Sequence, residues 1–194
     1  MPAQAPIWHH LDLYGYWLAQ RGSRTMPARS DLNPGDIPTL LPYLMIIEKV
    51  ADQYRYRLVG TAVVQAIGRD LTGCLVGSYV VDAKSAADVR VIYDRAFTAA
   101  HPVFATGAFT FKSGAKLTMS QLILPLSEDG VEVNMAVTTL SAGFNFDLAA
   151  SRNWLKGIPV KVCDVADVHD AEELKRLCRE WEQQGHTASL ASQG

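Results

Sequence analysis

The stretch YRYRLVGTAVVQAIGRDLTG, residues 54–73, decides the fold of this chain. Its opening YRYR alternates aromatic and charged side chains, a period-2 pattern that predicts a strand. Gly60 interrupts this strand, and Thr61 is placed to cap a short helix that continues to Ile67. Gly68 then ends the helix in the left-handed conformation, which glycine adopts without steric penalty. A strand, a short helix and a polar turn in close succession predict a small α+β domain.

Composition favours a soluble protein that binds no nucleic acid. The chain has 194 residues, of which 48% are hydrophobic, and a formal net charge of −2, which does not favour nucleic acid as a partner. Three cysteines without a CxxC motif argue against a disulfide framework and favour a reducing compartment. The first residues lack a signal peptide, and no run approaches the roughly 20 apolar residues of a membrane span. We therefore expect a cytoplasmic protein that does not insert into a membrane.

Residues 8–21 predict an N-terminal helix with Leu11 and Tyr14 on one apolar stripe. Something must cover this stripe, and both packing on the chain's own sheet and dimerisation with a second copy remain open. His9 and His10 are adjacent, so on a helix their side chains diverge by about 100°. A metal site needs three or four converging ligands, so we interpret the pair as solvated or facing a partner.

The next elements predict a hairpin, a long helix and a three-stranded meander. Residues 41–50 form an apolar run that predicts a first strand, paired antiparallel with the strand that begins at Tyr54. Residues 85–100 show the 3.6-residue spacing of a helix, with Asp82 or Ser85 as its cap. Short turns separate the last strands and imply an antiparallel meander. These strands are predicted at residues 103–111, 117–126 and 131–140.

The chain therefore divides into three parts. They are a lead-in with a helix and a proline-rich segment at residues 1–40, a core at residues 41–141, and an extension at residues 142–194. The extension predicts a short helix at residues 152–156 and an amphipathic helix at residues 170–184. Asp170 and Glu173 form a D-x-x-E capping pattern, and Gly185 is expected to end the second helix.

This order of elements resembles a PAS domain. The segments YWLAQRG, MPARSDLNPGDIPTLLPYL and LILPL, together with residues 54–73, resemble a stand-alone bacterial PAS family over about Tyr16 to Ser141. The resemblance implies a five-stranded antiparallel sheet with helices on one face, plus N- and C-terminal helical extensions. It also implies a sensory or signalling role and a ligand pocket between sheet and helices. A homodimer through the N-terminal helix and a signalling protein partner are further implications.

The sequence departs from the cofactor-binding members of that superfamily. Flavin-binding photosensors carry a reactive cysteine soon after a Gly-Arg-Asn, whereas here Leu71 follows Gly68-Arg69-Asp70 and Cys74 comes three residues later. Haem-binding members use a histidine on the long helix, but here His101 lies only at its end. We therefore carry over no flavin photochemistry and leave the cofactor unknown. No output domain is recognised after the sheet, so a signal is expected to pass through a partner.

Aromatic and polar residues of the long helix and the meander are the candidate ligand-binding residues. Gln121 or Thr139 would offer hydrogen bonds to a ligand if it faces a pocket, and would otherwise face solvent or bond to backbone. The pattern does not decide which face of the sheet lines the pocket. The candidates are Tyr93, Phe97, Phe104, Phe109, Phe111, Met119, Gln121, Met135 and Thr139.

No GxSxG, P-loop, HExxH or GxGxxG motif occurs, so we assign no catalytic residue and no metal ligand. Three functions remain open. The first is a sensory domain that binds a small ligand or a protein partner and signals through flanking helices. The second is a small α+β enzyme with an acid/base residue in the same pocket, which would need a perturbed pKa there. The third is a purely structural dimerisation module.

Overall fold

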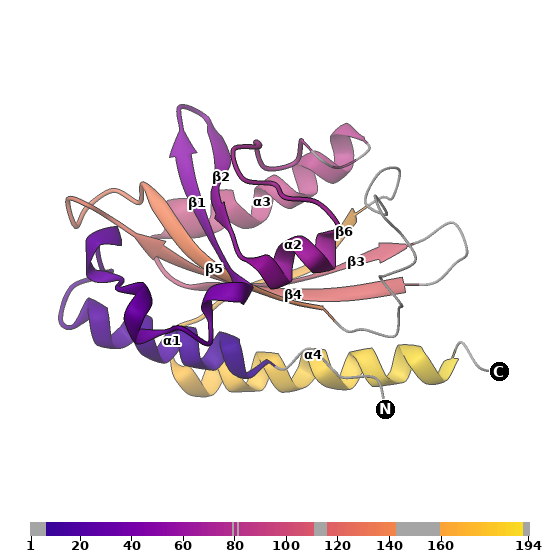
Figure 1. The fold of residues 1–194 in the computed structure, drawn as a ribbon. Helices are drawn as coiled ribbons and strands as arrows, with labels where there is room; N and C mark the ends of the chain where they lie inside the picture. The colour runs from indigo at the N-terminus through magenta and orange to yellow at the C-terminus, as the bar shows by residue number, and fades with distance from the viewer. Residues whose placement is uncertain (1–6, 79, 81, 111–115, 143–159, 192–194) are drawn as a thin grey trace.

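One antiparallel sheet organises the protein (Figure 1). The computed structural model describes residues 7–78, 80, 82–110, 116–142 and 160–191. Six strands follow the order β2-β1-β5-β4-β3-β6. The strands are β1 Leu44–Val50, β2 Gln53–Val59, β3 Val103–Thr110, β4 Lys116–Leu126, β5 Met135–Ala142 and β6 Val160–Asp167. The helices are α1 Trp8–Arg21, α2 Thr61–Ile67, α3 Ala83–Ala99 and α4 Ala171–Ala191, with 3-10 turns η1 Arg29–Asp31, η2 Pro34–Asp36 and η3 Leu41–Tyr43.

The stretch at residues 54–73 folds largely as its sequence predicts. β2 pairs antiparallel with β1, and Gly68 ends α2 with a φ of 76° while its N–H donates to Val64 O at 2.8 Å. The expected cap at Thr61 is wrong, because Gly60 is the N-cap residue and makes no side-chain cap. Gly60 is required there for a steric reason: an added Cβ would stand 2.3 Å from the carbonyl oxygen of Pro42.

The predicted hairpin and meander are both present, but the sheet has one strand more than expected. β3, β4 and β5 pair in sequence, and β5 then pairs with β1. The extra strand is β6, which pairs antiparallel with β3 and places Asp167 opposite Val103. The sequence of β6 alternates too weakly to predict a strand, and its partner lies far back in the chain.

α3 covers one face of the sheet, as the PAS resemblance implies. It begins where predicted, because Asp82 accepts a hydrogen bond from the Ser85 backbone N–H at 2.8 Å and a second from the Ser85 hydroxyl at 2.9 Å. It ends before His101, with Ala100 in the left-handed conformation. Tyr93 on this helix is 1% exposed, so it belongs to the core between α3 and the sheet.

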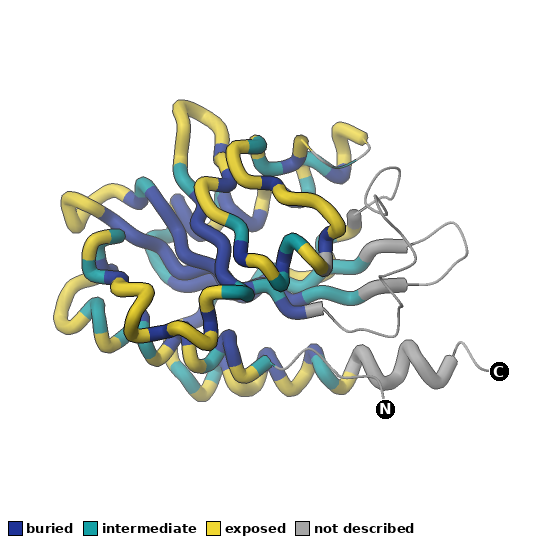
Figure 2. Tube along the Cα trace, viewed as in Figure 1, coloured by how far each residue is buried: buried dark blue, intermediate teal, exposed yellow. Residues whose placement is uncertain are grey.

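Helices α1 and α4 cover the opposite face of the sheet and run antiparallel to each other (Figure 1). Leu13, Tyr14 and Trp17 of α1 are buried, and Trp17 Nε1 donates to Pro125 O of β4 at 2.9 Å. The apolar stripe of α1 therefore packs on its own sheet. Figure 2 shows the result, a buried sheet between two helical layers whose outer sides are exposed.

α4 begins with the predicted capping pattern but runs further than expected. Glu173 N donates to Asp170 Oδ1 at 2.8 Å, and the Glu173 carboxylate accepts from His169 N at 2.9 Å. The expected end at Gly185 is wrong, since the helix continues to Ala191. Its buried residues in the described part are Leu174, Leu177, Cys178 and Trp181. The short helix expected at residues 152–156 lies outside the described residues.

Candidate functional site

Gln121 is the centre of a buried polar cluster between β4, β5 and α3. Its Nε2 donates to Tyr93 Oη and to Thr138 Oγ1, both at 2.9 Å. Gln121 is 9% exposed and Thr138 is fully buried. Buried amide and hydroxyl groups need such partners, because leaving a buried polar group without a hydrogen bond costs about 1–3 kcal/mol. A ligand that reached this cluster would therefore have to replace existing hydrogen bonds.

An aromatic group extends this cluster towards the edge of the sheet. The Tyr54 ring lies 5.8 Å from that of Tyr93 and 4.7 Å from that of Phe97, between ring centroids. Its hydroxyl donates to Asp94 Oδ1 at 2.8 Å. Burial, together with this carboxylate, raises the pKa of Tyr54 above its usual range, so the hydroxyl stays protonated.

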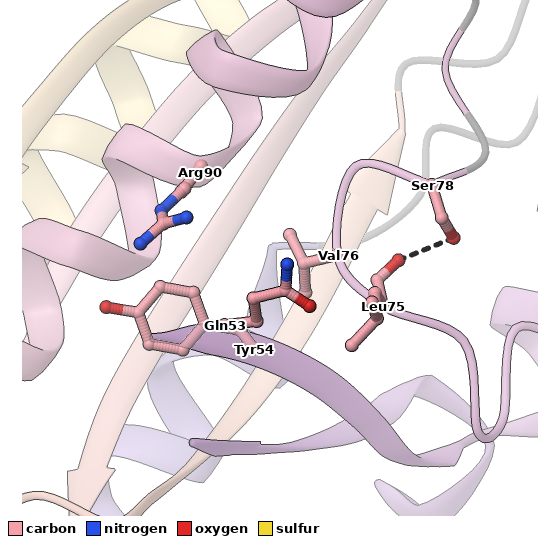
Figure 3. Close-up of a pocket in the computed structure, with 6 residues that line it drawn as sticks. All are labelled: Gln53, Tyr54, Leu75, Val76, Ser78 and Arg90. Atoms are coloured by element: carbon pink, nitrogen blue, oxygen red, sulfur yellow. Dashed lines mark hydrogen bonds between the residues drawn. The ribbon is translucent and has the colours of Figure 1, made fainter. Parts of the chain in front are cut away.

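An open pocket of about 190 Å³ adjoins Tyr54 (Figure 3). The Arg90 guanidinium stands 5.9 Å from the centroid of the Tyr54 ring, and Arg90 Nη2 donates to the Asp52 carbonyl at 2.5 Å. Across the pocket, the Ser78 hydroxyl donates to Leu75 O at 2.7 Å, the bond dashed in Figure 3. The lining residues are Gln53, Tyr54, Leu75, Val76, Ser78 and Arg90. Mixed polar and apolar walls suit a small polar molecule.

A second polar cluster lies on the opposite face of the sheet, under the first turn of α1. His10 Nδ1 is 2.6 Å from Thr139 Oγ1, and its Nε2 is 3.0 Å from both Ser120 Oγ and Ser141 Oγ. His9 Nε2 is 2.6 Å from the same Ser141 hydroxyl. Both histidines are 0% exposed, so the interpretation of a solvated or partner-facing pair is wrong. The hydroxyl partners come from strands far along the sequence, which the local pattern does not reveal.

The two imidazoles are surrounded by rings and hydroxyls. His9 stacks on Tyr43 with centroids 4.8 Å apart, and His10 meets the edge of Phe104 at 5.7 Å. Burial lowers the pKa of His9 to about 4, and the nearby Leu140 carbonyl opposes this only in part. Burial also lowers the pKa of His10 well below its usual value, and the neighbouring His9 adds to the effect. Both side chains are therefore neutral at neutral pH.

The candidate ligand-binding residues divide between these two faces of the sheet. Side chains alternate along a strand, so Gln121 faces α3 while Ser120 faces α1. Tyr93, Phe97, Met119 and Gln121 fall on the α3 side, whereas Phe104, Met135 and Thr139 fall on the α1 side. They do not line one common pocket. Phe109 belongs to β3, but its side chain and all of Phe111 lie outside the described part.

Sequence reasoning missed the residues of the open pocket and the buried histidines. Among the pocket residues only Tyr54 touches the predicted group, through Tyr93 and Phe97. Thr139 was singled out as a hydrogen-bonding point, and its observed partner is His10. The signal in the sequence for this cluster is the presence of hydroxyl side chains in strands otherwise rich in apolar residues, at Ser120, Thr139 and Ser141.

Comparison with known proteins assigns the family. The sequence profile of the PAS domain matches residues 8–141, which runs from α1 into β5. The chain belongs to the PAS domain family. The matched region leaves β6 and α4 outside, so these elements extend the PAS domain. No curated protein matches the chain in a sequence search.

One solved structure similar to this PAS protein is described as "Flavin Analogue Sheds Light on Light-Oxygen-Voltage Domain Mechanism". It is 13% identical, with a TM-score of 0.36, and the similarity covers 77% of this chain and 93% of that chain. At this level the likeness carries no argument about a cofactor. At the position of the photosensor cysteine this PAS protein has Leu71, which is fully buried and offers no thiol. Cys74 is half-buried and lies 3.8 Å from Arg69 Nη2.

Within the described parts of this PAS protein, no three His, Cys, Asp or Glu side chains come together in a way that would hold a metal ion. None of the helices in those same parts is long and apolar enough to cross a bilayer.

Proposed function

We propose that this protein is a cytoplasmic PAS sensor that binds a small ligand on the α3 side of the sheet and signals through α1 and α4. PAS domains are typically sensory rather than catalytic, and family membership favours this function over a small α+β enzyme. A structural dimerisation module is the other alternative. The sensor proposal extends to a signalling protein partner, which would receive the change in the helices.

One observation carries the proposal. Consecutive residues of β4 and of β5 face opposite helical layers: Gln121 bonds to Tyr93 of α3 and to Thr138, while Ser120 and Thr139 bond to His10 of α1. A ligand that changed the bonding of Gln121 would shift the strand backbone that also positions the α1 contacts. A ligand shifts such an equilibrium only through different affinities for the two arrangements.

The ligand proposed for this sensor is a small polar molecule. The open pocket offers the Arg90 guanidinium, the Gln53 amide and the Ser78 hydroxyl around the Tyr54 ring (Figure 3). From there Tyr54 contacts Tyr93 and Phe97, and Tyr93 bonds Gln121. A molecule in the pocket would therefore reach the polar cluster through one aromatic contact. Met119, another candidate residue on the α3 side of the sheet, is half-buried.

A homodimer through α1 is part of the proposal. The inner stripe of α1 packs on its own sheet, with half-buried Leu11 and Leu18 also against the core, which leaves Trp8 on the outer side at 36% exposure. Nothing lies within 4 Å of a Cβ added to Gly15, which is on the same outer side. A second α1 would find an apolar side chain and open space there.

Native mass spectrometry of the purified full chain, intact and after denaturation, tests the sensor proposal. A non-covalent small molecule retained on a dimer and released on denaturation is the expected result. A clean dimer without added mass would favour signalling by a protein partner alone. A strictly monomeric protein that retains no small molecule and binds no partner would contradict the proposal.

A further inference from the structure

The first turn of α1 buries two neutral imidazoles, those of His9 and His10, against the sheet. His9 and His10 are both 0% exposed, and their ring centroids are 5.0 Å apart. Together they meet three hydroxyls, those of Ser120, Thr139 and Ser141. A hydroxyl bonds equally well to a neutral imidazole as donor or acceptor, but it does not neutralise an added positive charge. The arrangement therefore fits only the uncharged pair.

The groups that face the pair from each neighbouring element carry no negative charge. Tyr43 of η3 stacks on His9, Phe104 of β3 meets His10, and β4 and β5 contribute the three hydroxyls. The charged groups near α1 influence the pKa of Tyr14 instead. They are Arg21 of α1 and, at the start of α4, Asp170 and Glu173. Among the described residues, each histidine thus faces only the other as a titratable base.

The helical layer that contains the pair has buried nitrogens without a hydrogen bond. Buried side-chain nitrogens that make no hydrogen bond of good geometry within the described residues include His9 Nδ1 and Arg21 Nε of α1 and Trp181 Nε1 of α4. Such groups weaken the docking of a segment relative to packing in which every polar atom is paired. The sheet face beneath α1 carries hydroxyls, which water can solvate once the helix has left.

The chain also offers a hinge for local release. Gly22 ends α1 with a φ of 58°, and the chain is anchored again where Ser127 N donates to Pro27 O at 3.1 Å. Met26, next to this anchor, is 2% exposed. The segment before the anchor can therefore move on its own, and its release would expose Leu13, Tyr14 and Trp17, which are buried while α1 is docked.

From these observations we propose that His9 and His10 make the docking of α1 sensitive to acid, so that protonation of the pair releases α1 from the folded PAS core. Protonating either imidazole places a charge beside the other base and away from any carboxylate. The released helix exposes both imidazoles to water, where each binds a proton readily. Acid therefore favours the released state. The proposal needs no ligand and stands apart from the sensor function.

The size of the effect follows from the pKa of His9, which burial lowers to about 4. In the released helix its pKa returns to about 6.5. Between pH 7.5 and pH 5 this one imidazole weakens docking by about 30-fold, and His10 adds to that factor. The response lies below neutral pH and is complete only when both side chains are protonated.

Hydrogen exchange of the full chain at pH 7.5 and pH 5, corrected for the intrinsic exchange rate, tests the proposal. Residues 8–21 are expected to lose protection by tenfold or more and, at pH 5, to exchange faster than residues 83–99 and 116–126, which become exposed only on wider unfolding. Unchanged protection of residues 8–21, or equal protection of all three segments at pH 5, would overturn the proposal. The second result would indicate ordinary cooperative acid unfolding.

Variants and a titration keep the test decisive. The double variant His9→Gln/His10→Gln keeps polar side chains that do not titrate, so its α1 protection should not respond to acid. His101→Gln is the matched control and should respond as the wild type does. If the double variant fails to fold, proton titration of the wild-type imidazoles by NMR decides: His9 and His10 should titrate well below the value of about 6.5 for a free imidazole, together with the loss of α1. Titration near pH 6.5 with α1 still docked would refute the proposal.

Discussion

Ser120 and Gln121 are consecutive residues of β4 whose side chains bond to opposite helical layers. Ser120 Oγ lies 3.0 Å from His10 Nε2 of α1, and Gln121 Nε2 lies 2.9 Å from Tyr93 Oη of α3. On β5, Thr139 bonds to His10 of α1, while Thr138 faces the α3 side and accepts from Gln121 Nε2. The two faces of the sheet are therefore joined through single peptide units, and the proposed sensor function depends on this connection.

Replacing Gln121 with Leu should lower the free energy of unfolding by about 1–3 kcal/mol. The substitution removes the donor to both Tyr93 and Thr138 inside a buried cluster. Urea unfolding followed by circular dichroism measures the change. Gln20→Leu, on the partly exposed side of α1, is the control and should change stability by less than about 0.5 kcal/mol. Equal effects of both substitutions would show that the cluster adds nothing to stability.

Gly60→Ala and Gly15→Ala should change stability in opposite directions. A Cβ at Gly60 would stand 2.3 Å from Pro42 O, so we expect a loss of about 1–3 kcal/mol from overpacking. A Cβ at Gly15 meets nothing within 4 Å, and alanine is the better helix former by about 0.5–1 kcal/mol. Thermal and urea unfolding of both variants check the signs. A neutral Gly60→Ala would contradict the close approach of α2 to η3.

Local signals in the sequence predicted the fold, and distant partners explain what the sequence could not show. The alternation after Tyr54 and the glycine at position 68 act within a few residues, so β2 and the end of α2 were predictable. β6 needs β3 as its partner, and His10 needs hydroxyls from β4 and β5. The local sequence pattern contains neither of these long-range relationships, so it predicts neither the extra strand nor the burial of the histidines.

The candidate site was predictable in its residue types but not in its arrangement. Gln121 and Thr139 stood out as polar residues in apolar strands, and both are buried and hydrogen-bonded. They point to opposite faces because their strands pair in a register that only the folded sheet defines: Gln121 is opposite Leu140, not Thr139. Arg90 escaped notice because an arginine on a helix is usually a solvated surface residue.

Acid should destabilise the whole protein before its carboxylates titrate. The pKa of His9 is lowered to about 4 in the folded state, from an unfolded value of about 6.5. The unfolded chain thus binds the proton more readily between these values, so stability is complete above about pH 6.5 and falls as the pH falls towards 4. His9 alone would contribute a loss of about 3 kcal/mol. Urea unfolding from pH 7.5 to pH 4.5 measures it, and His9→Gln should reduce the slope of the curve over that range and leave the part due to His10.

The three cysteines should react with thiol reagents at very different rates. Cys178 is 0% exposed between α4 and the core, and burial raises the pKa of its thiol to about 12. Because the thiolate is the nucleophile, Cys178 should stay unmodified at pH 8 until α4 leaves the sheet. Cys163 is exposed on β6 and should react first. Brief N-ethylmaleimide labelling followed by peptide mass spectrometry tests the order, and early labelling of Cys178 would mean that α4 is not stably docked.

The most direct test of the coupling between the two faces is hydrogen exchange of α1 in Gln121→Leu at neutral pH. The substituted side chain lies on the α3 face, away from α1, so a purely local effect would end at α3 and its neighbouring strands. We predict that residues 8–21 exchange several-fold faster than in the wild type, because the backbone that carries Ser120 and Thr139 shifts with the cluster. Exchange of residues 8–21 at the wild-type rate, with changes confined to α3, β4 and β5, would contradict a sensor that works through the sheet.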